Sequence, residues 1–142
     1  MKFLVRTFFV CLIVSTVWAQ EFRTGDEVHL LGEIQKDVDF FGHQKYSGTV
    51  QNSATWRVDF VKIEFMLFNK AKRLLLHKEV FIRGSKAEFP NNLTSLSSLK
   101  PNEKGDFVCL TPIPVDSIAN FKYTIYWMEY DTLPSIPSEE EK

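Results

Sequence analysis

Few side chains in this 142-residue chain could perform nucleophilic or metal chemistry. The histidines are His29, His43 and His77, and Cys109 is the one cysteine beyond the N-terminal twenty residues. Nucleophilic catalysis needs a serine, cysteine or threonine beside a base, and no Gly-x-Ser-x-Gly motif occurs. No two of these four residues have metal-ligand spacing such as Cys-x-x-Cys or His-x-x-x-His. The sequence therefore predicts no catalytic residue, no metal site and no cofactor.

Two classes of function stay open. The favoured one is a non-enzymatic module that binds a protein partner or a second copy of itself. The alternative is a small metal-handling or hydrolytic domain that uses the scattered histidines. A concave pocket shared by any two of the histidines and Cys109 would favour the alternative.

Charge excludes other classes of function. The 17 basic and 18 acidic residues leave a formal charge of −1, so the chain has no overall excess of positive charge that would predict binding to nucleic acid or an anionic membrane. The run Lys70-Ala71-Lys72-Arg73 is interpreted as a solvated basic turn, because it is too short for a nucleic-acid groove. Asn92-Leu93-Thr94 is a glycosylation sequon, which has meaning if the source is eukaryotic.

The first nineteen residues have the three-part pattern of a secretory signal peptide. Lys2 and Arg6 precede an apolar run over residues 8–14, and Val17-Trp18-Ala19 provides a cleavage site before Gln20. The apolar run is about half the roughly 20 residues that span a bilayer, so no permanent membrane anchor is expected. The chain is predicted to be exported, either periplasmic or secreted. Cleavage leaves Cys109 without an intrachain partner, so it is either a buried apolar residue or a thiol open to pairing with another chain, and its apolar neighbours favour burial.

The rest of the chain has the spacing of short strands and turns. Residues 58–68 alternate, with Ile63, Phe65 and Leu67 on one face. Residues 69–73 are a polar turn that leads to a second strand over 74–82. Residues 121–130 form the last strand, with Phe121, Tyr123, Ile125 and Trp127 on its core face. Other strands are expected over 28–34 (with a possible bulge at Gly32), 46–52, 93–99 and 106–111, and one helical turn within 115–120.

These elements predict an all-β fold, a two-sheet immunoglobulin-like sandwich of about seven strands, with a closed barrel as the alternative. The predicted organisation is a signal peptide over 1–19, the sandwich over 20–131, and a disordered acidic tail over 132–142. The tail contains two prolines and three successive glutamates and cannot bury enough surface to order itself.

Several short motifs resemble the FxLYD domain over about residues 46–110. These are Tyr46-x-Gly48-x-Val50-x-Asn52, then Phe65-Met66-Leu67-Phe68-Asn69, then Leu99-Lys100-Pro101-Asn102-Glu103 followed by Phe107. The chain departs from the family pattern by carrying Phe68 for Tyr, Asn69 for Asp, and Asn102 where a Gly often follows Pro. The resemblance implies an exported, immunoglobulin-like β-sandwich with no assigned activity. The same residues have structural explanations, since Gly48 relieves crowding and Asn69 can cap a turn.

One group of apolar residues is predicted to face outward. If Phe65 and Trp127 line the core, the alternate positions of their strands point to the opposite face. The predicted exposed patch, the candidate binding site for a protein partner or for self-association, consists of Met66, Phe68, Tyr126, Met128 and Tyr130. If the N-terminal segment or a loop covers these residues, they form a second small core instead.

Overall fold

The computed structural model describes residues 21–130 of the chain. The predicted signal peptide (1–19) and the predicted acidic tail (132–142) lie outside the described residues. Within residues 21–130, no helix has the length and apolar character needed to cross a membrane.

Eight strands and two single-turn 3-10 helices make up the described chain. The strands are β1 (Val28–Val38), β2 (His43–Asn52), β3 (Asp59–Phe68), β4 (Leu74–Phe81), β5 (Ser85–Phe89), β6 (Leu93–Ser98), β7 (Lys104–Pro114) and β8 (Asn120–Met128). The 3-10 helices are η2 (Pro90–Asn92) and η3 (Val115–Ser117), and η3 is the helical turn that the sequence predicts. The sequence patterns indicate every strand except β5, which is short and has only one buried residue.

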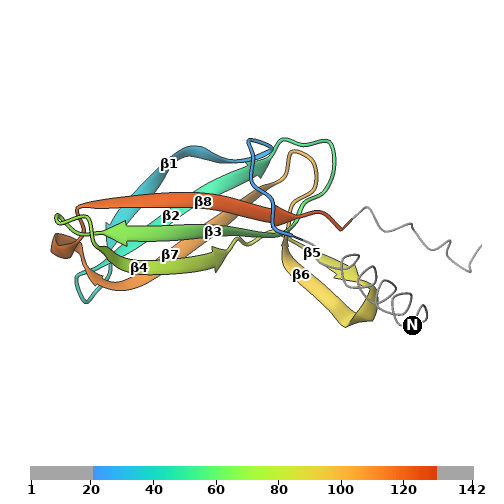
Figure 1. Cartoon of the computed structure of the whole chain (residues 1–142). Coiled ribbons are helices and arrows are strands. Elements are labelled where there is room, and N and C mark those ends of the chain that lie inside the picture. The colour runs from blue at the N-terminus through green and yellow to red at the C-terminus, as the bar shows by residue number, and fades with distance from the viewer. Residues whose placement is uncertain (1–20, 131–142) are drawn as a thin grey trace, which may run out of the picture.

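The strands form two antiparallel sheets that pack face to face, so the predicted all-β, two-sheet sandwich is confirmed. One sheet has the order β1-β2-β7 and the other β4-β3-β8, while β5 and β6 pair as a separate hairpin. Figure 1 shows β3, β4 and β8 in front of β1, β2 and β7, with the β5–β6 hairpin projecting from one end. Because the long strands run the length of the sandwich, turns and short connections gather at its two ends.

The core lies between the sheets, and Phe65 is at its centre. Ile63, Phe65 and Leu67 on β3 are fully buried, as their alternation predicts. The Phe65 ring stacks on Tyr46 with 5.1 Å between ring centroids and also contacts the rings of Phe107 and Phe121. Ile125 and Trp127 close the core from β8.

One residue assigned to the core face differs from the prediction. Tyr123 points to the inner side of its sheet, but 42% of its surface is exposed. The reason is its place in the fold, because β8 is an edge strand and its inner face overhangs the opening between the two sheets. Alternation gives the direction of a side chain, whereas the neighbouring sheet decides whether it is covered.

The motif residues on β2 and the bulge on β1 have structural roles. A side chain at Gly48 would place its Cβ 2.9 Å from the Phe107 ring, so this position needs glycine. Asn52 is buried, and its amide donates to the carbonyl oxygens of Trp56 and Leu99. The predicted bulge at Gly32 is confirmed, because the β1–β2 register shifts between Leu31 and Gln35 and Gly32 has a φ of +70°.

Candidate functional site

The three histidines lie in different parts of the sandwich. His29 pairs in register with Gln51 near one end of the β1–β2 ladder, whereas His43 pairs with Pro114 at the other end. His77 lies on the outer face of β4, opposite Met66. A hollow of about 260 Å³ between β1 and β8 is lined by His29 but by neither of the other histidines nor Cys109. The fold therefore does not assemble a histidine pair or a Cys–His pair in this hollow.

Cys109 is a core residue. It is free and fully buried. Burial raises the pKa of its thiol, an effect that the nearby Lys78 ammonium partly opposes. Burial, together with the adjacent Cys109, also raises the pKa of Tyr46 to about 12. Both groups therefore stay protonated at neutral pH, which is the opposite of what an activated nucleophile requires.

Across β3 and β4, three titratable side chains meet on the outer face. Glu64, His77 and Glu79 place one ligand-type atom each within 4.8 Å of one another. Strand pairing brings them together, since Glu64 lies opposite Glu79 in the ladder. His77 Nε2 is 3.1 Å from Glu64, and the Lys62 ammonium is 3.0 Å from Glu79. Lys62 already partners Glu79 and His77 already partners Glu64, so we interpret the cluster as a surface polar network.

The structure distributes the five residues of the predicted patch over two places. Met66, Phe68 and Tyr126 are half-buried on the outer face of the β4-β3-β8 sheet. Met128 pairs with Asp59 at the end of the sheet nearest the β5–β6 hairpin. Tyr130 lies beyond β8 and packs on Phe89, with 4.6 Å between ring centroids, and on Phe60.

The outer face around Tyr126 is mixed in character. The Phe22 ring contacts Tyr126 edge to face, with ring centroids 6.4 Å apart. The Lys62 ammonium lies over both rings, 3.9 Å from the Phe22 centroid and 5.6 Å from that of Tyr126. The segment before β1 therefore covers part of this face, and charged side chains separate Tyr126 from Met66.

Sequence reasoning did not identify the free edge of β8. The N–H and C=O of Trp127 bond to the backbone of Arg23, on the side of β8 away from β3. Backbone groups of alternate residues in a strand point to the same side, so those of Ile125 and Tyr123 also point away from β3. Within residues 21–130, no strand pairs with this edge of β8 between Phe121 and Ile125. This stretch of edge can accept a further strand.

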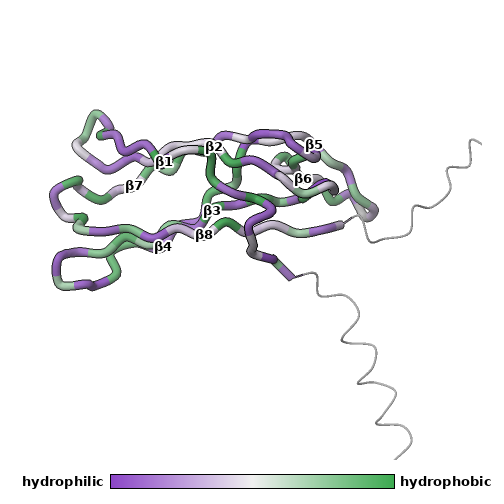
Figure 2. The backbone as a smooth tube through the Cα atoms, turned by 90° about the horizontal axis from the view of Figure 1, so that it is seen from above, coloured by the Kyte–Doolittle hydropathy of each residue, from purple (hydrophilic) through white to green (hydrophobic). Residues whose placement is uncertain are grey.

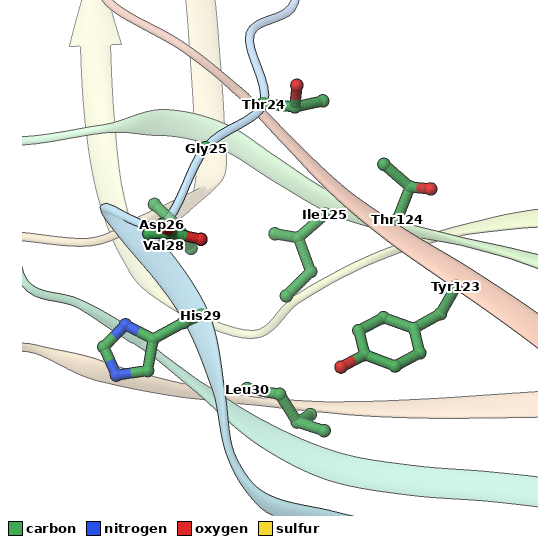
Figure 3. Close-up of a pocket in the computed structure, with 9 residues that line it drawn as sticks. All are labelled: Thr24, Gly25, Asp26, Val28, His29, Leu30, Tyr123, Thr124 and Ile125. Atoms are coloured by element: carbon green, nitrogen blue, oxygen red, sulfur yellow. The ribbon is translucent and has the colours of Figure 1, made fainter.

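The 260 Å³ hollow adjoins this free edge. Its lining comes from β1, β8 and the segment that precedes β1: Thr24, Gly25, Asp26, Val28, His29, Leu30, Tyr123, Thr124 and Ile125. Figure 3 shows the side chains of Tyr123 and Ile125 extending from β8 toward Leu30, while the His29 ring points away from them. The hollow thus has an apolar floor with polar groups from Thr24, Asp26 and Thr124 around it.

The opposite edge of the sandwich, between β4 and β7, is protected. The Lys78 ammonium donates to the carbonyl of Leu110 on the outer edge of β7. Arg83 bonds the same edge at Asp106, and the edge then continues through Pro112 and Pro114. Lysine and proline at such positions block pairing with another strand. The stretch of β8 from Phe121 to Ile125 has no proline and no bulge, and the ammonium of its one lysine, Lys122, lies 5.7 Å from the centroid of the Phe68 ring on β3, away from the free edge.

Comparison with known proteins finds low similarity. No protein-family model matches the chain, so the resemblance to the FxLYD domain stays a prediction. No curated protein matches it either. Among solved structures, a DUF1425 family member from Shewanella sp. pv-4 is 11% identical, with 78% of this chain and 81% of that chain covered and a TM-score of 0.40. The Salmonella enterica trimeric lipoprotein SadB is 12% identical, with 92% and 73% covered and a TM-score of 0.42. Sequence identities and TM-scores this low support no argument about the function or assembly of this chain.

Proposed function

We propose that the protein is an exported, non-enzymatic β-sandwich module that binds a protein partner by strand addition at the free edge of β8. The observation that carries this proposal is the difference between the two edges of the sandwich. The β4–β7 edge is blocked by Lys78, Pro112 and Pro114, whereas β8 offers the backbone groups of Tyr123 and Ile125 with no proline nearby, and its Lys122 is directed over the Phe68 ring on β3. Natural sheets usually protect their edges, so an unprotected edge is a candidate binding edge.

The partner segment is expected to be extended and to alternate in character. Main-chain hydrogen bonds to Tyr123 and Ile125 would hold it beside β8. Alternate side chains of an added strand point to one face, so every second residue would enter the hollow over Leu30 and Ile125. Apolar residues at these positions fit the apolar floor. Tyr126, Met66 and Phe68, on the adjoining outer face, belong to the proposed binding surface as a secondary contact region.

A proline at position 123 is expected to weaken partner binding without unfolding the protein. The Tyr123 N–H points away from β3, so Tyr123→Pro removes no hydrogen bond of the β3–β8 ladder. It removes one donor from the edge, and the loss of one main-chain hydrogen bond corresponds to about a tenfold lower affinity. Tyr123→Thr is the matched control, because it also removes the ring that lines the hollow but keeps the N–H, so it should bind about tenfold more tightly than Tyr123→Pro.

The measurement uses peptides selected from a random ten-residue library against the purified protein. Affinities for the two variants are compared, and amide hydrogen exchange is followed at Tyr123 and Ile125, with Thr124 and Tyr126 as internal references. Bound peptide should slow exchange at the first two amides. Failure to select any peptide, equal affinity for Tyr123→Pro, or protection at other amides only would contradict strand addition here.

Export is tested by the N-terminus of the mature protein. The charge, apolar and small-residue order of residues 1–19 predicts cleavage between Ala19 and Gln20. Mass spectrometry of the protein recovered from outside the cytoplasm should show a chain that begins at Gln20. A soluble protein outside the cytoplasm that retains Met1 would contradict the predicted cleavage, and recovery from the cytoplasm alone would contradict export.

A further inference from the structure

Two phenylalanine side chains project from the turn between β1 and β2. Phe40 is 97% exposed and Phe41 is 78% exposed, and their rings contact each other edge to face with centroids 5.5 Å apart. Neither side chain contributes to the core. Scattered exposed apolar residues are common on protein surfaces, but two adjacent, largely exposed aromatic side chains at a turn need an explanation.

The turn that carries them is held in a defined shape. The Asp39 carboxylate accepts hydrogen bonds from the backbone N–H groups of Phe41 and His43, at 2.8 and 2.9 Å. Backbone hydrogen bonds join Asp39 N–H to His43 O and Gly42 N–H to Asp39 O. Gly42 has a φ of +79°, which favours glycine. The two rings are thus presented by an ordered turn, so little conformational entropy is lost when they bind.

The fold brings a basic turn to the same end of the sandwich. The Val115 N–H bonds to Gly42 O, and the Ala119 N–H bonds to Phe68 O, so η3 links the β1–β2 turn to the β3–β4 turn. The β3–β4 turn carries Lys70, Lys72 and Arg73, all exposed. Figures 1 and 2 both show these three connections at the end opposite the β5–β6 hairpin, with the β7–β8 connection between the other two turns. We name this surface, residues 36–45, 68–74 and 112–122, the aromatic–basic end.

The aromatic–basic end has an excess of positive charge. Its basic residues are Lys36, Lys45, Lys70, Lys72, Arg73 and Lys122, and its acidic residues are Asp37, Asp39 and Asp116. Residues 21–130 as a whole carry equal numbers of basic and acidic residues, so the excess is local. Exposed aromatic rings beside exposed lysine and arginine are the chemistry that binds a bilayer surface, where rings enter the interfacial region and cations meet lipid phosphates.

We propose that the aromatic–basic end docks the protein on a membrane surface that contains anionic phospholipid, with Phe40 and Phe41 inserted at the headgroup level. The rings project from a convex turn, and a deformable bilayer can receive a convex apolar tip without a preformed cavity. The basic residues on the neighbouring turn match the negative charge of such a surface. This contact is peripheral, and it does not use the backbone groups of Tyr123 and Ile125 that the proposed strand addition requires.

The test is sedimentation of the mature protein with two kinds of vesicle. One kind is pure phosphatidylcholine, and the other contains about one third phosphatidylglycerol. The protein should bind the anionic vesicles, and binding should fall steeply between about 0.05 and 0.5 M NaCl, because salt screens exposed charges. Phe40→Ser combined with Phe41→Ser should lower partitioning at least about tenfold, and so should Lys70, Lys72 and Arg73 changed together to Gln.

Matched control variants distinguish membrane docking by the aromatic–basic end from strand addition at the free edge of β8. Leu96→Ser removes a side chain that is 67% exposed on β6, at the opposite end, and should leave vesicle binding unchanged. Tyr123→Pro should also bind vesicles as the unmodified chain does. In a Phe41→Trp variant, anionic vesicles should shift the fluorescence of the new indole to the blue. A parallel Phe41→Leu variant gives the signal of the native tryptophans for subtraction.

Several results would overturn the proposal. They are an absence of binding to anionic vesicles, equal binding to neutral and anionic vesicles at every salt concentration, and unchanged binding after the two serine substitutions. If the serine substitutions abolish self-association in solution while vesicles are never bound, the tip belongs to a protein interface and the membrane assignment is wrong.

Discussion

Replacing Phe65 by Ala is expected to lower the free energy of unfolding by about 3–5 kcal/mol. The Phe65 side chain is fully buried, and its ring contacts those of Tyr46, Phe107 and Phe121. These contacts come from both sheets, so the cavity cannot close without moving one sheet against the other. A domain of this size is stable by only about 5–15 kcal/mol, so the variant should be near the limit of folding.

The measurement is urea unfolding followed by tryptophan fluorescence. Phe65→Leu is the matched control, since it retains most of the apolar volume and should cost about 1–1.5 kcal/mol. Met66→Ala, on the half-buried outer face of the same strand, should cost less than Phe65→Ala. Equal losses at positions 65 and 66 would show that the two faces of β3 are assigned wrongly.

Replacing Arg57 by Met is expected to cost about 3–5 kcal/mol because it leaves a buried carboxylate without its cation. Asp59 is fully buried, and its Oδ1 accepts from Arg57 Nε at 2.9 Å and from Ser98 Oγ at 2.7 Å. Because the one hydroxyl proton of Ser98 goes to Asp59, Ser98 Oγ accepts from the Ser95 hydroxyl at 3.0 Å, and Ser95 Oγ in turn accepts from the Phe60 N–H. This network fastens β6 to the start of β3, so its loss should loosen the β5–β6 hairpin first.

A second substitution gives the control for this prediction. Asp59→Asn in the Arg57→Met background removes the buried charge and keeps an acceptor for Ser98, so it should recover a large part of the lost stability. Urea unfolding of the two single variants and the double variant provides the complete cycle. Additive losses would contradict the pairing, and unchanged stability of Arg57→Met would show that Asp59 needs no cation.

The sequence by itself determined the fold class and the inward direction of most core side chains. Alternation in residues 58–68 places Ile63, Phe65 and Leu67 on one face, and the polar residues 69–73 make a turn that ends that strand. These patterns are local, because the period of a strand and the chemistry of a turn depend on neighbouring residues only. For the same reason Gly32 could be predicted as a bulge.

Only the tertiary structure decided which surfaces are covered and which residues meet. Alternation directs Tyr123 toward the core, but β8 is an edge strand, so the ring lies over the opening beside β1. Phe22 covers part of Tyr126, and Tyr130 packs with Phe60 and Phe89, far along the chain from either. Coverage depends on contacts between distant segments, which no short window of sequence contains.

The two proposed sites also depend on contacts between distant segments, which the sequence alone does not give. β8 has a free edge because it is the last strand of the β4-β3-β8 sheet. The sequence does not give this strand order, so it cannot show that the edge of β8 is free while the edge of β7 is blocked. The turn with Phe40 and Phe41 and the turn with Lys70, Lys72 and Arg73 are about thirty residues apart in the chain. The net charge of the whole chain is near zero and therefore does not reveal the excess of positive charge at this end. Electrostatic interactions depend on distances in space, and only the fold sets those distances.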